Sequence, residues 1–397
     1  MFDLLRSLPT KPVSDALLEA FFFAVWPLCP LVHSPTLQAD YDEFWDWCRN
    51  CGNAMPSDKI RDDPTFICLL FAVLYCGTSA APAASWTCAN LQGLRKETIM
   101  NQLRSAYTTS LSLCQHLEHP TLNTLISTLL TGPFLDQPHE PMCNLVSVST
   151  TIRIAQSMGL HREGAWSELS PVDREIRRRA WWHIVWLDVQ SSISTGLPPC
   201  CGGEALEAVS IVADTRDEDI GNFPVGRSPR AYSEASEQSL AILLAIQRFR
   251  TARLESKVVA HLQSGQSLTQ GAFGDLVTAA KELQLNIDTL IARIPTYRIP
   301  ENGVTSSSLA NASPINTTLD KHDANQPTAF AAWARIMLIL LKSEMTILIQ
   351  KPFLAPPDST NSQSRKSWTK YESFSTYLIP IFLHCCSACT CTDRFIQ

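Results

Sequence analysis

The chain has 397 residues, of which 45% are hydrophobic and 18% are charged, and its formal net charge is −6 at pH 7. This balance is typical of a globular protein with a substantial core, in one large domain or two, and excludes a disordered chain. Because nucleic-acid affinity depends heavily on Lys and Arg, the acidic balance also argues against direct DNA binding by this chain.

No membrane-spanning or secretory segment is predicted. The N-terminus, residues 1–11, is too polar for a signal peptide, and the apolar stretch 16–32 is interrupted by Glu19, Pro27 and Pro30. Without a secretory signal, the 14 cysteines favour an intracellular, reduced compartment rather than a disulfide framework.

Helical periodicity is common along the chain and strand signals are sparse, so we predict an all-α protein. The predicted helices cover, in chain order, residues 16–25, 66–76, 143–158, 171–195, 236–261, 273–294 and 329–350. A short tail, residues 1–14, precedes a single large multi-helix domain that occupies residues 15–397.

Three polar segments interrupt the helices. Residues 296–328 are rich in Asn, Ser, Thr and Pro and predict a long flexible insertion, and residues 356–367 predict a second polar loop. The acidic stretch Asp214–Asp219, with Gly221 and Pro224 after it, predicts a solvated turn. It lacks the Gly and Glu positions of a calcium-binding loop.

The segment 150–199 is the most informative. Gly159 suits the left-handed position after a helix, with Leu160 folding back on the last turn. Ser170 is a good N-cap, followed by Pro171 and then by Asp173 in the first turn, and the next helix is predicted to end at Gly196.

This helix carries two neighbouring apolar stripes and is therefore predicted at the centre of the bundle. The stripes consist of Ile176, Ala180, Ile184 and Leu187, and of Trp182, Trp186, Val189 and Ile193. Asp188, on so apolar a helix, needs a cationic or hydrogen-bonding partner, and Arg153 and Arg162 are our candidates.

The run Arg177-Arg178-Arg179 resembles a basic patch for phosphate or nuclear import. Asp173 and Glu175 lie four residues before Arg177 and Arg179, so we favour structural ion pairing over a nucleic-acid role.

The cysteine-rich segments lack a complete set of metal ligands. Cys48 and Cys51 have the spacing of half a zinc site, and Cys385, Cys386, Cys389 and Cys391 follow His384. We interpret both groups as core-packing residues. The sequence also lacks a nucleophile elbow, a phosphate-binding Gly-Lys loop and a dinucleotide-binding glycine motif.

An ordered set of motifs resembles the fungal-specific transcription factor domain, the middle homology region of binuclear-zinc-cluster regulators. The residues that carry the resemblance, which we assign a structural role, are Arg153, Gly159, Leu160, His161, Arg162, Arg177, Arg178, Arg179, Trp181, Trp182, Asp188, Gly196 and Pro198. Weaker similarity, at residues 27–36, 69–77 and 348–354, extends it over roughly residues 15–391. Val189 and Leu197 stand where the family usually has Arg.

The resemblance implies a nuclear regulator of RNA polymerase II transcription, of a metabolic gene cluster, that is not an enzyme. Its expected partners are other proteins or a second copy, and a small-molecule effector. The family's zinc cluster is expected before this domain, but the domain begins almost at Met1. DNA and zinc are therefore expected only through a missing module or a partner, and no metal or catalytic residue is assigned here. The C-terminal end also looks incomplete.

A function from another class is a helical enzyme or small-molecule sensor with an aromatic pocket. Its candidate residues are Asp188, His161, His183, Trp181, Trp182 and Trp186.

Overall fold

The computed structural model describes residues 2–49, 61–81, 83–87, 90–135, 141–221, 239–263, 270–294 and 329–350. The regular elements within these ranges are helices, which confirms the all-α prediction. Among the same residues, no helix has the length and apolarity needed to cross a bilayer. The predicted insertion at 296–328, the loop at 356–367 and the cysteines after residue 351 lie outside the described residues.

The elements follow one another as two groups. The first group is α1 (Phe2–Leu5), α2 (Lys11–Ala24), α3 (Ser34–Arg49), α5 (Phe66–Ala80), η1 (Ala83–Thr87), α6 (Lys96–Leu113) and α7 (Leu122–Leu135). The second is α8 (Pro141–Ser157), η2 (Glu163–Ala165), α9 (Pro171–Thr195), α10 (Glu204–Glu207), η3 (Asp217–Asp219), α11 (Leu240–Gln263), α12 (Gln270–Arg293) and α14 (Ala329–Gln350).

All seven predicted helices are present, but among the described residues the long helices α3, α6 and α7 and the four-residue helices α1 and α10 were missed. In α3 only Leu37, Tyr41 and Phe44 are buried, which leaves too narrow an apolar stripe to be noticed in the sequence. Helix α6 is similarly polar, and α7 contains Pro133 within its last turn. The predicted tail, residues 1–14, includes α1 and the first turn of α2.

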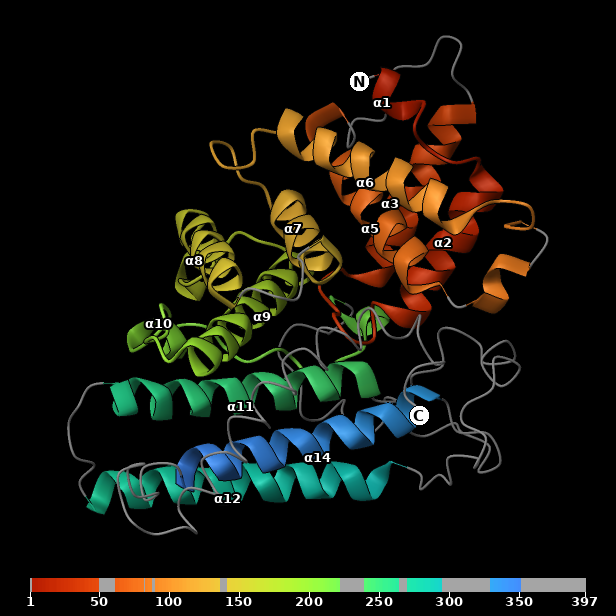
Figure 1. Cartoon of the computed structure of the whole chain (residues 1–397). Helices are drawn as coiled ribbons and strands as arrows, with labels where there is room; N and C mark the ends of the chain where they lie inside the picture. The colour runs from red at the N-terminus through yellow and green to blue at the C-terminus, as the bar shows by residue number, and fades with distance from the viewer. Residues whose placement is uncertain are drawn as a thin grey trace.

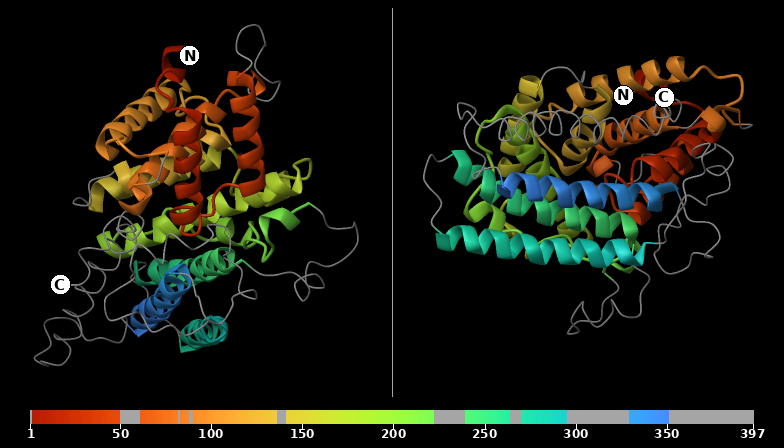
Figure 2. Two further views of the ribbon diagram at one scale, coloured as in Figure 1. Left: turned by 90° about the vertical axis from the view of Figure 1, so that its right-hand side faces the viewer. Right: turned by 60° about the horizontal axis from the view of Figure 1, so that its bottom comes forward.

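The helices pack into two cores, and α11 contributes buried residues to both of them. Figure 1 shows α2, α3, α5 and α6 on one side of the molecule and α11, α14 and α12 stacked on the other, with α9 between them. The left view in Figure 2 keeps this separation. The large core includes buried residues of α2, α5, α7 and α9, and the smaller one is formed by α11, α12 and α14.

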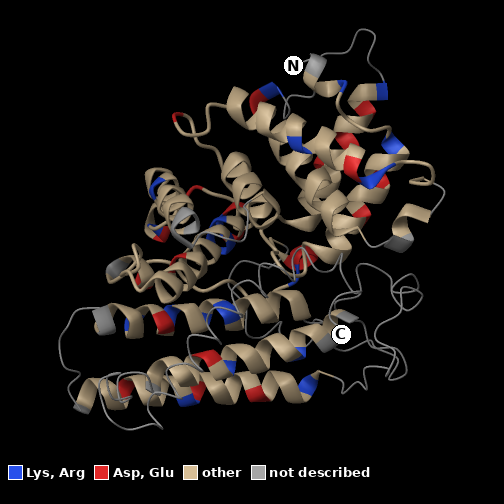
Figure 3. Cartoon of the chain, in the orientation of Figure 1, with Lys and Arg blue, Asp and Glu red and all other residues tan. Residues whose placement is uncertain are grey.

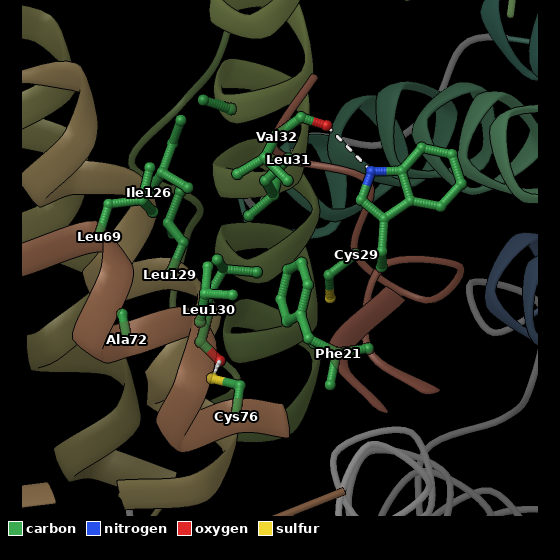
Figure 4. Close-up of a cluster of buried hydrophobic side chains, with 14 of the residues drawn as sticks. Phe21, Cys29, Leu31, Val32, Leu69, Ala72, Cys76, Ile126, Leu129 and Leu130 are labelled. Carbon is green, nitrogen blue, oxygen red and sulfur yellow. Dashed lines mark hydrogen bonds between the residues drawn. The ribbon is translucent and has the colours of Figure 1, made fainter. Parts of the chain in front are cut away.

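Helix α5 is the centre of the large core. Its residues from Phe66 to Thr78 are all buried, as expected of a helix that is apolar on every side. Figure 4 shows how polar groups in this core are satisfied locally. The Cys76 thiol donates to the carbonyl of Leu130 at 3.4 Å, and Trp26 Nε1 donates to the carbonyl of Val32 at 2.9 Å.

Helices α2 and α5 approach closely where α5 has Gly77. A Cβ atom added to Gly77 would lie 2.1 Å from the carbonyl oxygen of Leu17. Backbone, rather than a flexible side chain, therefore occupies the space that any larger residue would need.

We predict that Gly77→Ala destabilises the protein by about 3 kcal/mol, because the two helices must separate to admit the methyl group. Gly274→Ala is the matched control, since a Cβ at Gly274 of α12 meets nothing within 4 Å. That change should be neutral or stabilising by about 0.5–1 kcal/mol. Urea unfolding of both variants tests this, and equal midpoints would contradict it.

Candidate functional site

Helix α9 begins and ends as its sequence predicts. Ser170 Oγ accepts a hydrogen bond from the backbone N–H of Asp173 at 3.0 Å, and Pro171 is the first helical residue. Gly196 ends the helix with φ of 74°. Between these ends, every residue from Arg179 to Ser192 is buried except Leu187. The predicted central position of the helix is therefore correct.

The turn after α8 is a Schellman motif. Gly159 has φ of 73°, the N–H of Leu160 donates to Ala155 O at 3.0 Å, and the N–H of Gly159 donates to Gln156 O at 3.0 Å. Leu160 and Ala155 are both fully buried. Gly159 therefore ends α8 and Leu160 folds back on its last turn, as predicted.

The central feature of the site is a buried ion pair between α9 and η3. Arg179 Nη2 lies 2.7 Å from Asp217 Oδ1, and both side chains are 1% exposed. Arg179 also pairs with Glu175, one turn earlier, at 3.4 Å, which confirms the predicted Glu175–Arg179 pair. Figure 3 shows the acidic η3 in red beside the N-terminal helices.

Asp217 also binds the turn before α3. Its Oδ2 accepts hydrogen bonds from the backbone N–H of Ser34 at 2.8 Å and from Ser34 Oγ at 3.0 Å. Its carbonyl oxygen lies 2.7 Å from His33 Nε2. The carboxylate is therefore satisfied by Ser34, from a distant segment of the chain, as well as by Arg179.

The prediction that Asp214–Asp219 forms a solvated turn is wrong for Asp217. Asp217 is buried because Arg179, on an apolar helix, requires a counter-charge, and this acidic stretch provides one. Glu218 is exposed and pairs with Arg216 at 3.2 Å, so part of the stretch does face solvent.

The pKa of Asp217 reflects these contacts. Burial would raise it, but the Arg179 charge and the hydrogen bonds from Arg179 and Ser34 together hold the pKa below its ordinary value of 3.8. Because the folded pKa is lowered, the contribution of Asp217 to stability is present above pH 3.8. It is lost as the pH falls through the folded pKa.

A second group of ion pairs holds the loop before η3. Arg178 pairs with Glu163 of η2 and, at 3.3 Å, with Glu175. Glu163 Oε2 accepts the N–H of Ser210 at 2.6 Å, and Glu175 Oε1 accepts the N–H of Ala213 at 3.2 Å. The two carboxylates thus fasten residues 210–213 to α9.

Arg177 differs from its neighbours. It is half-buried, and burial lowers its pKa while the charge of Asp173 acts in the opposite direction. The Asp173 carboxylate accepts a hydrogen bond from Ser170 Oγ at 2.7 Å. Asp173 therefore acts on Arg177 as a neighbouring charge, rather than through the close contact that was predicted.

Asp188 has a backbone partner and not the predicted arginines. Its two oxygens accept the N–H groups of Cys200, at 3.1 Å, and Cys201, at 2.7 Å. Burial raises the pKa of this carboxyl and the two backbone hydrogen bonds oppose that effect. Asp188 thereby holds the chain that returns from Gly196, whereas Arg162 is exposed and Arg153 bonds Gln156 at 3.1 Å.

The tryptophans of the motif belong to the large core. Trp181 and Trp182 are fully buried there, and Trp182 Nε1 donates to the carbonyl of Ser210 at 2.8 Å. The His161 ring lies 6.1 Å from the Trp181 ring. These contacts are those of packed side chains and do not favour the aromatic pocket of an enzyme or sensor.

The structure brings only part of the predicted motif together. The residues that meet around the ion pairs and the buried face of α9 are Arg177, Arg178, Arg179, Trp181, Trp182 and Asp188. Gly159, Leu160, His161 and Gly196 shape the turns on either side, while Arg153, Arg162 and Pro198 are exposed. Sequence reasoning missed the roles of His33, Glu163 and Asp217.

The comparisons with known proteins agree with this arrangement. Residues 18–244 match the fungal specific transcription factor domain, a match that includes α9 and all of the ion pairs described above. The chain belongs to this family. No solved structure matches the chain.

The chain is 67% identical over 384 residues to the transcription factor macR of Penicillium terrestre, covering 96% of this chain and 45% of that protein. It is 70% identical over 319 residues to the transcription factor yanR of Aspergillus niger, covering 80% and 39%. It is 28% identical over 190 residues to the aurofusarin cluster transcription factor aurR2 of Gibberella zeae, covering 47% and 26%. The chain therefore spans less than half the length of these relatives.

We predict that Asp217→Asn destabilises the protein by about 3–5 kcal/mol, because it leaves the buried Arg179 charge without its counter-charge. Glu218→Gln, the adjacent change in an exposed ion pair, should cost about 0–1 kcal/mol. Thermal unfolding at pH 7 measures both. Similar losses in the two variants would show that the buried pair contributes no more than a surface pair.

The same pair predicts an acid dependence. The stability difference between the natural protein and Asp217→Asn should shrink as the pH falls from 3.8 through the lower folded pKa, since the carboxylate is protonated first in the unfolded chain and then in the folded one. Denaturant unfolding at a series of acidic pH values checks this, and a constant difference would contradict it.

Proposed function

We propose that this chain is the regulatory and interaction part of a nuclear regulator of RNA polymerase II transcription that controls a metabolic gene cluster. The observation that carries the proposal is membership of the fungal specific transcription factor family over residues 18–244. Similarity to proteins named as transcription factors over nearly the whole chain supports it, and a more distant relative is named for a biosynthetic cluster.

The geometry supports an interaction role, because charged contacts tie distant segments of the chain to α9. The ion pairs of Arg178 and Arg179 connect α9 to the turn at Ser34, to η2 and to residues 210–217. Helix α9 also packs against α8 and α11. A ligand or protein bound to one group of helices would therefore act on the other through α9. The partners we propose are other regulators or a second copy of the chain, with a small-molecule effector.

Access to DNA follows one of two routes in this proposal. Either a zinc cluster encoded with this domain supplies it, or a partner protein does. Mapping both ends of the native transcript distinguishes the two: an upstream exon with a six-cysteine cluster supports the first, and a transcript that begins at Met1 supports the second. In the second case, immunoprecipitation should recover a zinc-cluster protein with the chain.

The regulatory role predicts a transcriptional response. Fused to a heterologous DNA-binding domain, the full chain should change transcription of a reporter in a fungal nucleus, and deletion of its gene should change transcripts of neighbouring biosynthetic genes. The fusion with Glu218→Gln should behave as the natural chain, whereas Asp217→Asn should lose the effect with its stability. No change in the reporter or in any transcript would contradict the proposal.

A further inference from the structure

Helix α14 has a second apolar face in addition to the one that packs against α11 and α12. The residues of its inner face are buried in the second core, among them Ala334, Leu338, Leu341 and Met345. The opposite side of the helix carries a stripe, here called the outer stripe, that consists of Ile336, Ile339, Leu340, Ser343 and Ile347. These positions follow the spacing of residues that share one face of a helix.

The outer stripe is open to solvent although it is apolar. Ile336 and Ile339 are 46% and 47% exposed, and the other three residues are partly buried. Only Ser343 among the five is polar. A surface helix ordinarily has charged and polar residues on its outer side. Single exposed hydrophobic residues need no explanation, whereas a contiguous group of them marks an interaction site.

The charged side chains of α14 lie outside the outer stripe. Arg335 donates to two backbone carbonyls at the C-terminal end of α12, at 3.0 and 3.3 Å. Lys342 pairs with Asp288 of α12 at 2.6 Å. Glu344 follows Ser343 by one position and therefore projects about 100° around the helix from it. The outer stripe thus has no charge with which to select a charged partner.

Helix α12, which packs against α14, has the outer side of an ordinary surface helix. Figure 3 shows acidic and basic residues spread along it. Its exposed Leu285, at 68%, has Lys281, Glu282 and Asp288 as neighbours on the same side of the helix. The outer stripe of α14 lacks such charges and has the composition of a covered surface.

The chain continues after α14 with a segment of matching composition. Residues 374–389, here called the C-terminal apolar segment, include the run Tyr-Leu-Ile-Pro-Ile-Phe-Leu and contain no Asp, Glu, Lys or Arg. They lie outside the described residues. Apolar side chains in such a run are favoured by removal from water, and the cysteines in it are those that the sequence predicts to pack in a core.

The connection is long enough for this segment to reach the outer stripe. Residues 351–373 separate it from the end of α14, and an extended chain of that length spans at most about 75 Å. Ile336, at the far end of the outer stripe, lies only about 21 Å along the helix from Gln350. A segment of the same chain also meets the outer stripe at an effective concentration that a separate molecule rarely reaches.

We propose that the C-terminal apolar segment docks on the outer stripe of α14 and covers Ile336 and Ile339. Neither surface has an Asp, Glu, Lys or Arg that would lose its hydration on contact. Burial of aliphatic side chains from both surfaces supplies the driving force. Docking encloses α14 on both its inner and its outer side, as expected of a helix that is apolar on both.

Photo-crosslinking of the full chain tests this contact. With p-benzoyl-phenylalanine in place of Ile339, cross-links should form to residues 374–389 of the same chain. The same group in place of Leu285 is the matched control and should not form them. A mixture of isotope-labelled and unlabelled chains distinguishes cross-links within a chain from those between chains, and mass spectrometry of the digested protein locates them.

Hydrogen exchange measures the strength of docking. Ile336→Gln/Ile339→Gln should raise the exchange rates of residues 374–389 about tenfold or more, because much of the apolar area that holds the segment is lost. Leu285→Gln should leave these rates unchanged. Because the two isoleucines are nearly half exposed, α11 and α12 should keep their exchange rates in the double variant, which shows that the second core remains folded.

Cross-links from position 339 to a second copy of the chain would overturn the proposal and assign the outer stripe to a dimer. Cross-links that reach none of residues 374–389 would also overturn it, as would exchange of this segment that is the same in the natural chain and the double variant.

Discussion

The buried pair of Arg179 and Asp217 is the interaction on which the arrangement of the large core depends. An isolated charge at either position would be strongly destabilising, so each side chain requires the other. Asp217 in turn binds Ser34 and His33. A single carboxylate thereby connects α9, η3 and the turn that begins α3, which lie far apart in the sequence.

The position of α9 follows from this constraint and from its apolar surface. One side of the helix packs in the core formed with α5 and α7, and Ile193 at its C-terminal end contacts the second core. Asp188 holds the returning chain at Cys200 and Cys201. Helix α9 therefore packs between the large core and α11, and the family motif is concentrated on it.

The second core has a different electrostatic character. Where the large core pairs its charges, the buried carboxyl group of Glu255 on α11 meets the neutral amide of Gln190 on α9, at 3.4 Å. Burial without a cationic partner raises the pKa of this carboxyl group. Ion pairs thus connect α9 to the turn that begins α3, whereas the buried carboxyl group of α11 is held by a neutral amide.

The sequence by itself determined the local features: the Ser170 cap, the glycine turns at Gly159 and Gly196, and the central, buried character of α9. These depend on side chains within a few residues of each other. It missed α3, α6 and α7, and it assigned Asp217 to solvent and Asp188 to arginine partners. Only the tertiary structure decided those contacts, because Arg179 and Asp217 are 38 positions apart and Asp217 and Ser34 are 183 apart. Local periodicity contains no information about which distant donor a buried charge will meet.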